Sequence, residues 1–370
     1  MIKVLLTNFH PLDGGGHATY IKSLCSKSEL KSLDIAIASP FESTLYQYAR
    51  TSGLLCFAVD FPGKLKEIHS ILFNMFRLRR ILKKHEFHII HCNGSPDHKL
   101  VTLTLMTLLH SDRPKLVVTK HNSFPIAKNW LTHWRFRRWT DAVITVCSKQ
   151  ATEFRQSQSL REVSVTNIAN GVDLDHFHPP REHSDRYKLR HDLGIEDRTI
   201  IFVSCAGTAT HKGWNLLATA CAQLSDTHLI VLGGIPSPEK LADLFPQGTP
   251  ANLTFPGQQT DVRPYLWAAD IGFVLSTSVE TISFACREMM STGLPMLVSD
   301  FGCLAENIDD ETGWVVKAGN ISSIMNFASR IPDFDLQKMR DAARRRAEKL
   351  FDVKVFRQRT YEVYENVLSK

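Results

Sequence analysis

The sequence predicts an α/β protein of two doubly wound, Rossmann-like parallel sheets in tandem, followed by a helical tail. Short apolar runs rich in β-branched residues alternate with helix-sized segments, as in βαβ units. The alternation stops over the polar, proline-containing segment 177–198 and then restarts, which indicates a domain boundary. The length of 370 residues suits two domains, and a composition of 43% hydrophobic and 22% charged residues excludes a disordered or collagen-like chain.

The first half contains candidate strands that are short and apolar, with helix-sized spaces between most of them. They are Lys3–Thr7, Asp34–Ala38, Leu54–Val59, Ile89–Cys92, Lys115–Thr119, Ala142–Val146 and Ser164–Ile168. The second half repeats the pattern with Ile200–Cys205, Leu229–Leu232, Leu253–Phe255, Ile271–Leu275, Pro295–Ser299 and Trp314–Val316.

Helices are expected between these strands, for example over Trp214–Gln223 and Val262–Ala268, and the tail from Leu336 is helical with a break near Phe351. We expect domains at residues 1–180 and 181–350, with a final helix over 351–370 that crosses back to the first domain. Parallel sheets bind ligands at the carboxyl ends of their strands, so tandem sheets favour a nucleotide-type ligand in a cleft.

Eight cysteines show neither a CxxC pair nor zinc-ligand spacing, so we interpret them as reduced thiols of a cytosolic protein. The first apolar run is too short for a secretory signal, and no apolar run reaches the length of a membrane-spanning helix.

Three segments at expected strand ends could carry chemistry. Gly14-Gly15-Gly16 before a helix would let the backbone approach an anion, although a flexible turn is the alternative and the GxGxxG pattern is absent. Lys212 at a strand-to-helix junction is placed to neutralise a phosphate, unless it is an ordinary surface lysine. Glu280 leaves a strand and Glu288 follows two helical turns later, so both could accept hydrogen bonds from sugar hydroxyls.

The order of these motifs resembles glycosyltransferase family 4, a family of retaining enzymes with the GT-B fold that use nucleotide sugars. The resemblance covers nearly the whole chain and rests on the glycine-rich first loop, Asn170-Gly171-Val172-Asp173, Lys212-Gly213, the Glu280 and Glu288 pair, Gly293-Leu294-Pro295, Asp300-Phe301-Gly302 and Thr312-Gly313. The two glutamates followed by Gly-Leu-Pro are its most specific part.

The resemblance implies a role for each matching residue. Glu288 would bind the nucleotide ribose, Glu280 the hydroxyls of the donor sugar, and Lys212 the donor diphosphate. His121 would lie near the donor sugar and the acceptor, which makes His121, Lys212 and Glu280 the expected catalytic residues. The remaining expected donor contacts are Gly15, Gly16, Gly207, His211, Thr281, Ile282 and Ser283, with Glu306 closing a loop behind the site.

The sequence departs from the family in two places. Gly207 and Thr208 stand where the family often has an arginine, and we expect His211 to supply part of that charge. Thr281-Ile282-Ser283 replaces the common Gly-Phe-Gly, so side chains are expected to intrude on the loop and the donor sugar need not be that of typical members.

The implied mechanism is substitution on the face that the nucleotide leaves, with the leaving diphosphate helping to deprotonate the acceptor. Lys212 would stabilise that diphosphate, and no carboxylate nucleophile is required. We expect no cofactor and no metal ion, with a UDP-sugar as the commonest donor. Asp173-Leu174-Asp175 and Asp333-Phe334-Asp335 both spell DxD, but we interpret the first as part of a turn and the second as a helix cap.

Two stretches of the first half are strongly basic. Segment 64–86 has a net charge of +5 on an amphipathic helical pattern, with Ile68, Ile71, Leu72, Met75, Leu78 and Leu82 as its apolar face. Segment 113–140 has a net charge of +7, and Trp130, Trp134, Arg135, Arg137 and Arg138 are its candidate acceptor or membrane contacts. Arginine with tryptophan suits an anionic membrane interface or nucleic acid, and we favour the membrane because the resemblance implies lipid-linked acceptors.

The preferred interpretation is a retaining glycosyltransferase on the cytoplasmic face of the membrane, acting on a glycan or glycolipid acceptor in bacterial lipopolysaccharide or surface-polysaccharide assembly. Three alternatives stay open: a transferase with a small soluble acceptor, a nucleotide-sugar epimerase, and a degenerate member that only binds polyanions or partners. The missing arginine and Gly-Phe-Gly support the last alternative, whereas Lys212, Glu280 and Glu288 together argue against it.

Overall fold

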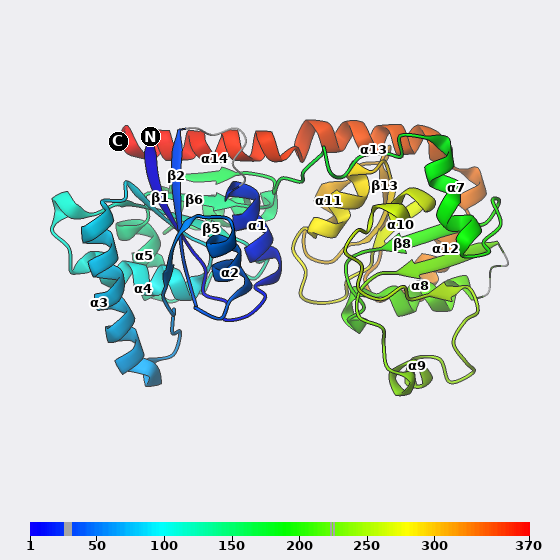
Figure 1. Ribbon diagram of the computed structural model, residues 1–370, viewed down its shortest axis with the longest axis horizontal. Helices are drawn as coiled ribbons and strands as arrows, with labels where there is room; N and C mark the ends of the chain where they lie inside the picture. The colour runs from blue at the N-terminus through cyan, green and yellow to red at the C-terminus, as the bar shows by residue number, and fades with distance from the viewer. Residues whose placement is uncertain (26–31, 223, 225) are drawn as a thin grey trace. The chain divides into compact units, whose positions relative to one another are not determined.

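A computed structural model describes residues 1–25, 32–222, 224 and 226–370 of the chain. The described residues divide into two compact units (Figure 1). Unit 1 comprises Met1–Gly171 and Val353–Lys370, and unit 2 comprises Val172–Asp352. Each unit consists of a parallel sheet with helices on both faces, which confirms the predicted pair of doubly wound domains.

The sheet of unit 1 contains seven described strands in the order β3-β2-β1-β4-β5-β6-β7, all paired in parallel. The strands are β1 (Ile2–Thr7), β2 (Leu33–Ser39), β3 (Leu55–Ala58), β4 (Ile89–Cys92), β5 (Lys115–Lys120), β6 (Ala142–Thr145) and β7 (Val165–Asn167). The order reverses beside β1, where Val4 faces Ile35 of β2 on one side and Ile89 of β4 on the other. Such a reversal is the place where open α/β sheets bind ligands.

Helices on both faces of this sheet bury its apolar strands. They are α1 (Gly15–Cys25), α2 (Thr44–Thr51), α3 (Ile68–His85), α4 (Ser95–Met106), α5 (Trp130–Trp139), α6 (Ser148–Gln156) and α14 (Val353–Leu368). Leu82 of α3, Leu100 of α4 and Phe154 of α6 pack in one core with Leu5 and Ile90 of the sheet. Burial of these side chains contributes about 1.5–3 kcal/mol each.

Helix α14 comes from the end of the chain and completes unit 1. Tyr364 of α14 hydrogen bonds through its hydroxyl to Nδ1 of His91 at 2.7 Å, and Nε2 of His91 lies 2.6 Å from Oγ1 of Thr119. Tyr20 of α1 joins the same network, 3.0 Å from Thr119 and with its ring edge-on to Phe356. Burial lowers the pKa of His91 to about 3, so the ring is neutral and needs both hydrogen bonds.

The sheet of unit 2 contains six described strands in the order β10-β9-β8-β11-β12-β13. They are β8 (Ile200–Ser204), β9 (Thr227–Val231), β10 (Leu253–Thr254), β11 (Ile271–Val274), β12 (Met296–Ser299) and β13 (Gly313–Val316). The helices of this unit are α7 (His183–Asp192), α8 (Trp214–Cys221), α9 (Pro238–Leu244), α10 (Arg263–Ala268), α11 (Phe284–Ser291), α12 (Ile321–Ala328) and α13 (Leu336–Leu350). Trp214 is fully buried beside Phe202 and Phe273, and it anchors α8 on the sheet.

Every predicted strand overlaps an observed one, and the predicted break near Phe351 separates α13 from α14. Gln223, the last residue of one predicted helix, lies outside the described residues. Segment 172–180, which we expected in the first domain, packs within unit 2: Trp267 donates to the carbonyl of His178 at 2.7 Å and Val172 donates to that of Phe351 at 2.7 Å. Within the described part of the chain, no helix combines the length and hydropathy needed to span a membrane.

We predict that Tyr364→Phe destabilises unit 1 by about 1–3 kcal/mol, because it leaves a fully buried ring nitrogen of His91 without its partner. Tyr361→Phe, on the partly exposed side of the same helix, is the matched control and should change the free energy of unfolding by less than about 0.5 kcal/mol. Urea denaturation of both variants measures the difference, and equal stability of the two would contradict the proposed importance of the network.

Candidate functional site

In unit 2, the loops that follow β8 and β11 bring two of the expected site residues together. Lys212 ends a short 3-10 turn, and its Nζ lies 2.8 Å from Oε2 of Glu280. The lysine side chain is 21% exposed and the glutamate 11%, so water screens this pair only weakly. The backbone N–H of Thr281 also donates to Oε1 of Glu280 at 3.1 Å, which fixes the carboxylate toward the loop.

Two glycines allow these loops to pack backbone against backbone. A Cβ at Gly213 would collide with the carbonyl group of Leu275, and a Cβ at Gly302 would collide with that of Glu280. Both glycines also have positive φ, 75° and 65°, which L side chains rarely adopt. The close approach sets where Lys212 and Glu280 meet.

Glu288 lies on α11, and its carboxylate has no hydrogen-bond partner among the described residues. Burial raises the pKa of Glu288 to about 7, since a carboxylate that leaves water without a partner favours its neutral form. Glu288 also raises the pKa of the Cys205 thiol at the end of β8, which places the carboxylate at the same sheet edge as the Lys212 loop. A carboxylate left without partners can accept hydrogen bonds from the hydroxyls of a ligand.

Ser283 begins α11 with an unusual backbone. Its φ is 54°, and its hydroxyl oxygen accepts a hydrogen bond from the N–H of Cys286 at 3.4 Å, as an N-cap residue does. Val279 in the same loop has a φ of 50°. Non-glycine residues with positive φ are strained and concentrate at functional sites, where the surrounding structure holds them in place.

In unit 1, the glycine-rich loop after β1 leads into a cluster of histidine rings. The ring of His17 lies 4.3 Å from that of His121 and 4.7 Å from that of His10, and Nε2 of His121 lies 2.9 Å from Oδ1 of Asn93. Burial lowers the pKa of His17 to about 4 and holds that of His121 well below its ordinary value, so both rings are neutral. Nδ1 of His17 and Nε2 of His10 are buried without partners, which marks this cluster as incomplete without a ligand.

A cavity of about 240 Å³ adjoins this cluster, also in unit 1. Its lining includes His17, Asn93, His121, Phe124 and Arg135. Arg135 is only 8% exposed, and its Nη1 is buried without a partner, so a cation without a counter-charge faces the cavity.

The chain matches known proteins over both units. Residues 14–176 match the model of Glycosyltransferase Family 4, and residues 197–331 match that of Glycosyl transferases group 1. Together these two matches support a glycosyltransferase like those of family 4, as the resemblance predicted.

Curated relatives match the chain over part of their own length. A lipopolysaccharide core biosynthesis mannosyltransferase of Rhizobium meliloti is 27% identical over 53% of the chain and 56% of the relative. An Escherichia coli UDP-Gal:alpha-D-GlcNAc-diphosphoundecaprenol alpha-1,3-galactosyltransferase is 25% identical over 70% of each. The chain thus spans about half the length of the first of these relatives.

Solved structures share the fold of the chain. A glycosyltransferase from Rickettsia africae superposes with a TM-score of 0.85 at 18% identity, over 99% of this chain and 98% of that one. The Anabaena protein HepE, solved with UDP and glucose, superposes with a TM-score of 0.80 at 18% identity, over 99% of this chain and all of that one. These likenesses confirm the predicted GT-B class.

Three of the expected donor contacts, Gly207, His211 and Ile282, lie in loops of unit 2, and the side chain of Ile282 differs from expectation. Ile282 is buried, with 4% of its surface exposed, and its carbonyl accepts from Asn307 at 2.6 Å, so its side chain does not intrude on the loop as we expected. His211 uses its carbonyl to accept from the N–H of Thr277 at 2.8 Å, which ties its turn to the loop of Glu280. Gly207 has a φ of 91° and lies in the same β8 loop as Lys212.

The two DxD sequences have structural roles. Asp173 accepts from the N–H groups of Asp175 and His176, both at 3.0 Å, and so closes a turn. Asp335 caps α13 by accepting from the N–H of Lys338 at 3.0 Å, as the sequence predicted.

The basic segments of unit 1 are less uniform than their sequences suggested. Trp130 is 72% exposed and Arg137 and Arg138 are exposed, but Trp134 is only partly so and packs edge-on against Trp139. Arg135 does not belong to this surface, because α5 turns it inward to the cavity.

Helix α3 also differs from its predicted pattern. Ile68 and Leu72, expected in its core face, are 45% and 42% exposed, and Phe73 and Phe76 beside them are 66% and 61% exposed. The other four predicted residues, Ile71, Met75, Leu78 and Leu82, are confirmed: they lie in the core of unit 1 or pack against it. The first turns of α3 therefore present apolar side chains to solvent.

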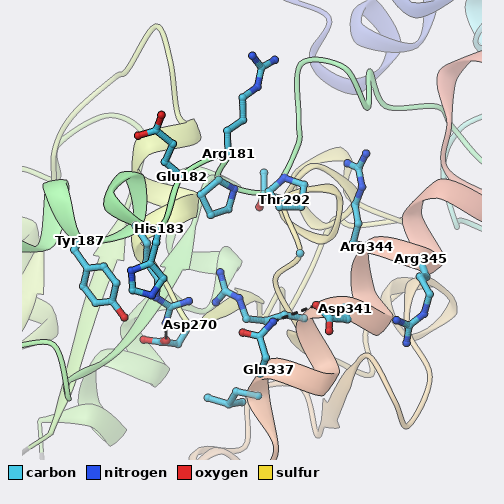
Figure 2. Close-up of a pocket in the computed structure, with 16 residues that line it drawn as sticks. Arg181, Glu182, His183, Tyr187, Asp270, Thr292, Gln337, Asp341, Arg344 and Arg345 are labelled. Carbon is cyan, nitrogen blue, oxygen red and sulfur yellow. Dashed lines mark hydrogen bonds and ion pairs between the residues drawn. The ribbon is translucent and has the colours of Figure 1, made fainter.

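Sequence reasoning missed two groups of residues. His10, His17 and Asn93 have no motif of their own, although His17 lies one residue beyond the glycine run that drew attention to this loop. A pocket of unit 2 was also missed, because most of its lining residues come from segment 177–198, predicted as a domain boundary, and from the tail helix α13 (Figure 2).

We predict that Ser283→Gly is more stable than Ser283→Ala by about 1 kcal/mol or more. Glycine removes the cost of the positive φ, whereas alanine keeps that cost and also loses the capping hydroxyl. Urea denaturation of unit 2 measures the difference, and an alanine variant as stable as the glycine variant would contradict the strain at this residue.

Proposed function

We propose that the chain is a retaining glycosyltransferase that moves a sugar from a UDP-sugar to a lipid-linked glycan acceptor in lipopolysaccharide or surface-polysaccharide assembly. The observation that carries this proposal is the Lys212–Glu280 ion pair beside the unpartnered carboxylate of Glu288. Lys212 can neutralise a diphosphate, and the two glutamates can accept hydrogen bonds from hydroxyls. All three groups lie at one edge of the same sheet. The relatives named above act in lipopolysaccharide core biosynthesis or use UDP-galactose with a diphosphoundecaprenol acceptor, which supports the same class of reaction.

When the donor binds, its diphosphate replaces Glu280 as the ion-pair partner of Lys212. Glu280 then becomes available to the sugar hydroxyls, while Glu288 accepts from the ribose. Charge builds up on the leaving diphosphate in the transition state, where a positioned lysine in a site with little water lowers the barrier. The acceptor attacks from the face that the diphosphate leaves, so the anomeric configuration is retained without a covalent enzyme intermediate and without a metal ion.

The cavity of unit 1 is the proposed acceptor site. His121 lies on its wall, and the unpaired Nη1 of Arg135 provides a buried cation for the phosphate of a diphosphate-linked acceptor. A neutral acceptor would leave that charge uncompensated, which is costly in a buried site. This cation favours the lipid-diphosphate acceptor over a small neutral one.

The surface of α3 and α5 supports peripheral attachment to the cytoplasmic face of an anionic membrane. Phe73, Phe76 and Trp130 are exposed apolar side chains, and Arg137 and Arg138 are exposed cations on the same two helices. Aromatic residues next to arginines suit the boundary between lipid headgroups and acyl chains. An enzyme held there would meet its acceptor in the plane of the membrane.

We predict that UDP binds the full-length protein in calorimetric titrations and that EDTA leaves its affinity unchanged. Lys212→Ala should weaken UDP binding about tenfold or more, the equivalent of about 1.4 kcal/mol, since a charge-assisted hydrogen bond to phosphate is lost. Lys188→Ala, an exposed lysine of α7, is the matched control. Titrations with GDP and ADP identify the donor class if UDP is not the ligand, and a folded protein that binds none of the three would support the degenerate, partner-binding alternative.

Glu288→Ala should abolish most of the turnover in a sugar-transfer assay while the protein stays folded, because the nucleotide ribose loses its hydrogen-bond acceptor. Near-normal turnover of this variant would remove Glu288 from the proposed site.

We also predict that the protein sediments with vesicles containing phosphatidylglycerol at low salt and is released as the salt concentration rises. The double variant Phe73→Ser with Phe76→Ser should reduce sedimentation severalfold. Leu193→Ser, an exposed leucine of unit 2, serves as the control. No sedimentation of the unmodified protein at low salt would contradict membrane attachment and favour a soluble acceptor.

A further inference from the structure

Unit 2 contains a pocket of about 790 Å³ that is separate from the donor residues. Its walls are the segment 179–182, helix α7, Asp270 at the start of β11, the Thr292-Gly293 turn, and helix α13 (Figure 2). Asp270 precedes β11 whereas Glu280 follows it, so the pocket and the donor residues lie at opposite edges of the sheet. The volume is that of a small-molecule site.

The floor of the pocket holds more positive than negative charge. Asp270 forms ion pairs with both Arg186 and Arg190 and also accepts from the N–H of Ile201 at 2.8 Å. Arg340 of α13 joins the same cluster, and its Nη1 donates to the carbonyl of Ala269 at 2.9 Å. Three guanidinium groups thus surround one buried carboxylate.

The pKa of Arg340 reflects this excess of positive charge. The residue is only 8% exposed, and burial together with the charges of Arg186 and Arg190 lowers its pKa to about 10. Among the described residues, the side chain of Arg340 makes one hydrogen bond, to the carbonyl of Ala269. Its other guanidinium nitrogens therefore have no acceptor within this part of the chain. A buried cation in this state is stabilised by an anion.

A purely structural role accounts for Arg190 but not for the other two arginines. Arg190 is 1% exposed, and its guanidinium group is satisfied by hydrogen bonds to the carbonyls of Ala268, Asp197 and Thr199. Arg186 and Arg340 line the pocket and each has one partner within the described chain.

The remaining acids and bases around the pocket do not balance this charge. The pocket is lined by five arginines and by three carboxylates, those of Glu182, Asp270 and Asp341. Arg181 and Arg345 add positive charge at the rim, and their side chains extend away from the centre of the pocket (Figure 2). Arg344 donates to the carbonyls of Phe177 and Ser291 and so closes one wall.

We propose that this pocket binds a phosphate-bearing small molecule, with Arg186 and Arg340 as the groups that hold the phosphate. Arg186 of α7 and Arg340 of α13 both line the pocket, and the planar fork of a guanidinium group can donate paired hydrogen bonds to a phosphate. The rings of His183 and Tyr187, 4.8 Å apart, form an aromatic wall for the rest of such a ligand. The site is independent of the donor residues and of the proposed transferase reaction.

The test is calorimetric titration of inorganic diphosphate into the full-length Lys212→Ala protein, in which the donor site has lost its phosphate-binding lysine. We expect binding that Arg186→Gln and Arg340→Gln each weaken about tenfold or more, about 1.4 kcal/mol. Lys338→Ala removes an exposed positive charge from the same helix α13 outside the pocket and should leave the affinity unchanged. Arg186→Gln is expected to keep the fold, because Asp270 retains Arg190.

Parallel titrations with inorganic phosphate and with UMP distinguish the sources of the phosphate. Tighter binding of UMP than of phosphate, lost in Arg186→Gln, would assign a nucleotide-type ligand that uses the aromatic wall. Equal binding would assign a free phosphate or diphosphate. Absence of diphosphate binding by the folded Lys212→Ala protein, or binding that neither arginine variant weakens, would overturn the proposal whether or not the chain transfers sugar.

Discussion

The donor side of unit 2 depends on a close packing of backbones that only glycine permits. Gly213 lies against the carbonyl group of Leu275, and Gly302 lies against that of Glu280, so three loops from different strands are held in contact. Any side chain at either position would separate the loops and move Lys212 away from Glu280. The strained φ of Ser283 is tolerated for the same reason, since Asn307 holds the carbonyl of Ile282 just before it. The ion pair is thus a result of loop packing rather than its cause.

Because the strands of unit 2 are parallel, two different groups of functional residues lie at the two ends of its strands. Residues after the strands form the donor side, and residues before them form the arginine-lined pocket. Helix α11 connects the two, because it begins at Ser283 in the donor loop, carries Glu288, and ends at Ser291 beside the Thr292-Gly293 turn of the pocket. Gly293 therefore lines the pocket and is also the first residue of the Gly-Leu-Pro motif.

Much of this architecture could be predicted from sequence because it follows from local patterns. Apolar runs of strand length predicted the sheets, and the order of Lys212, Glu280 and Glu288 predicted a shared site, since parallel strands end at one edge. Contacts between distant segments could not be predicted. The inward turn of Arg135, the burial of Ile282 and the meeting of His10, His17 and His121 depend on tertiary packing that no local spacing encodes. The arginine pocket was missed for the same reason, because its two walls are far apart in the chain.

The division of the chain into units has a consequence for the order in which they form. Unit 2 is continuous in sequence, whereas unit 1 is interrupted after Gly171 and resumes at Val353. During synthesis the ribosome polymerises all of unit 2 before it makes α14, so Tyr20 and His91 lack their partners Phe356 and Tyr364 until α14 has been made. Unit 1 can therefore fold completely only after all of unit 2 has been synthesised, although β1 is made before any part of unit 2.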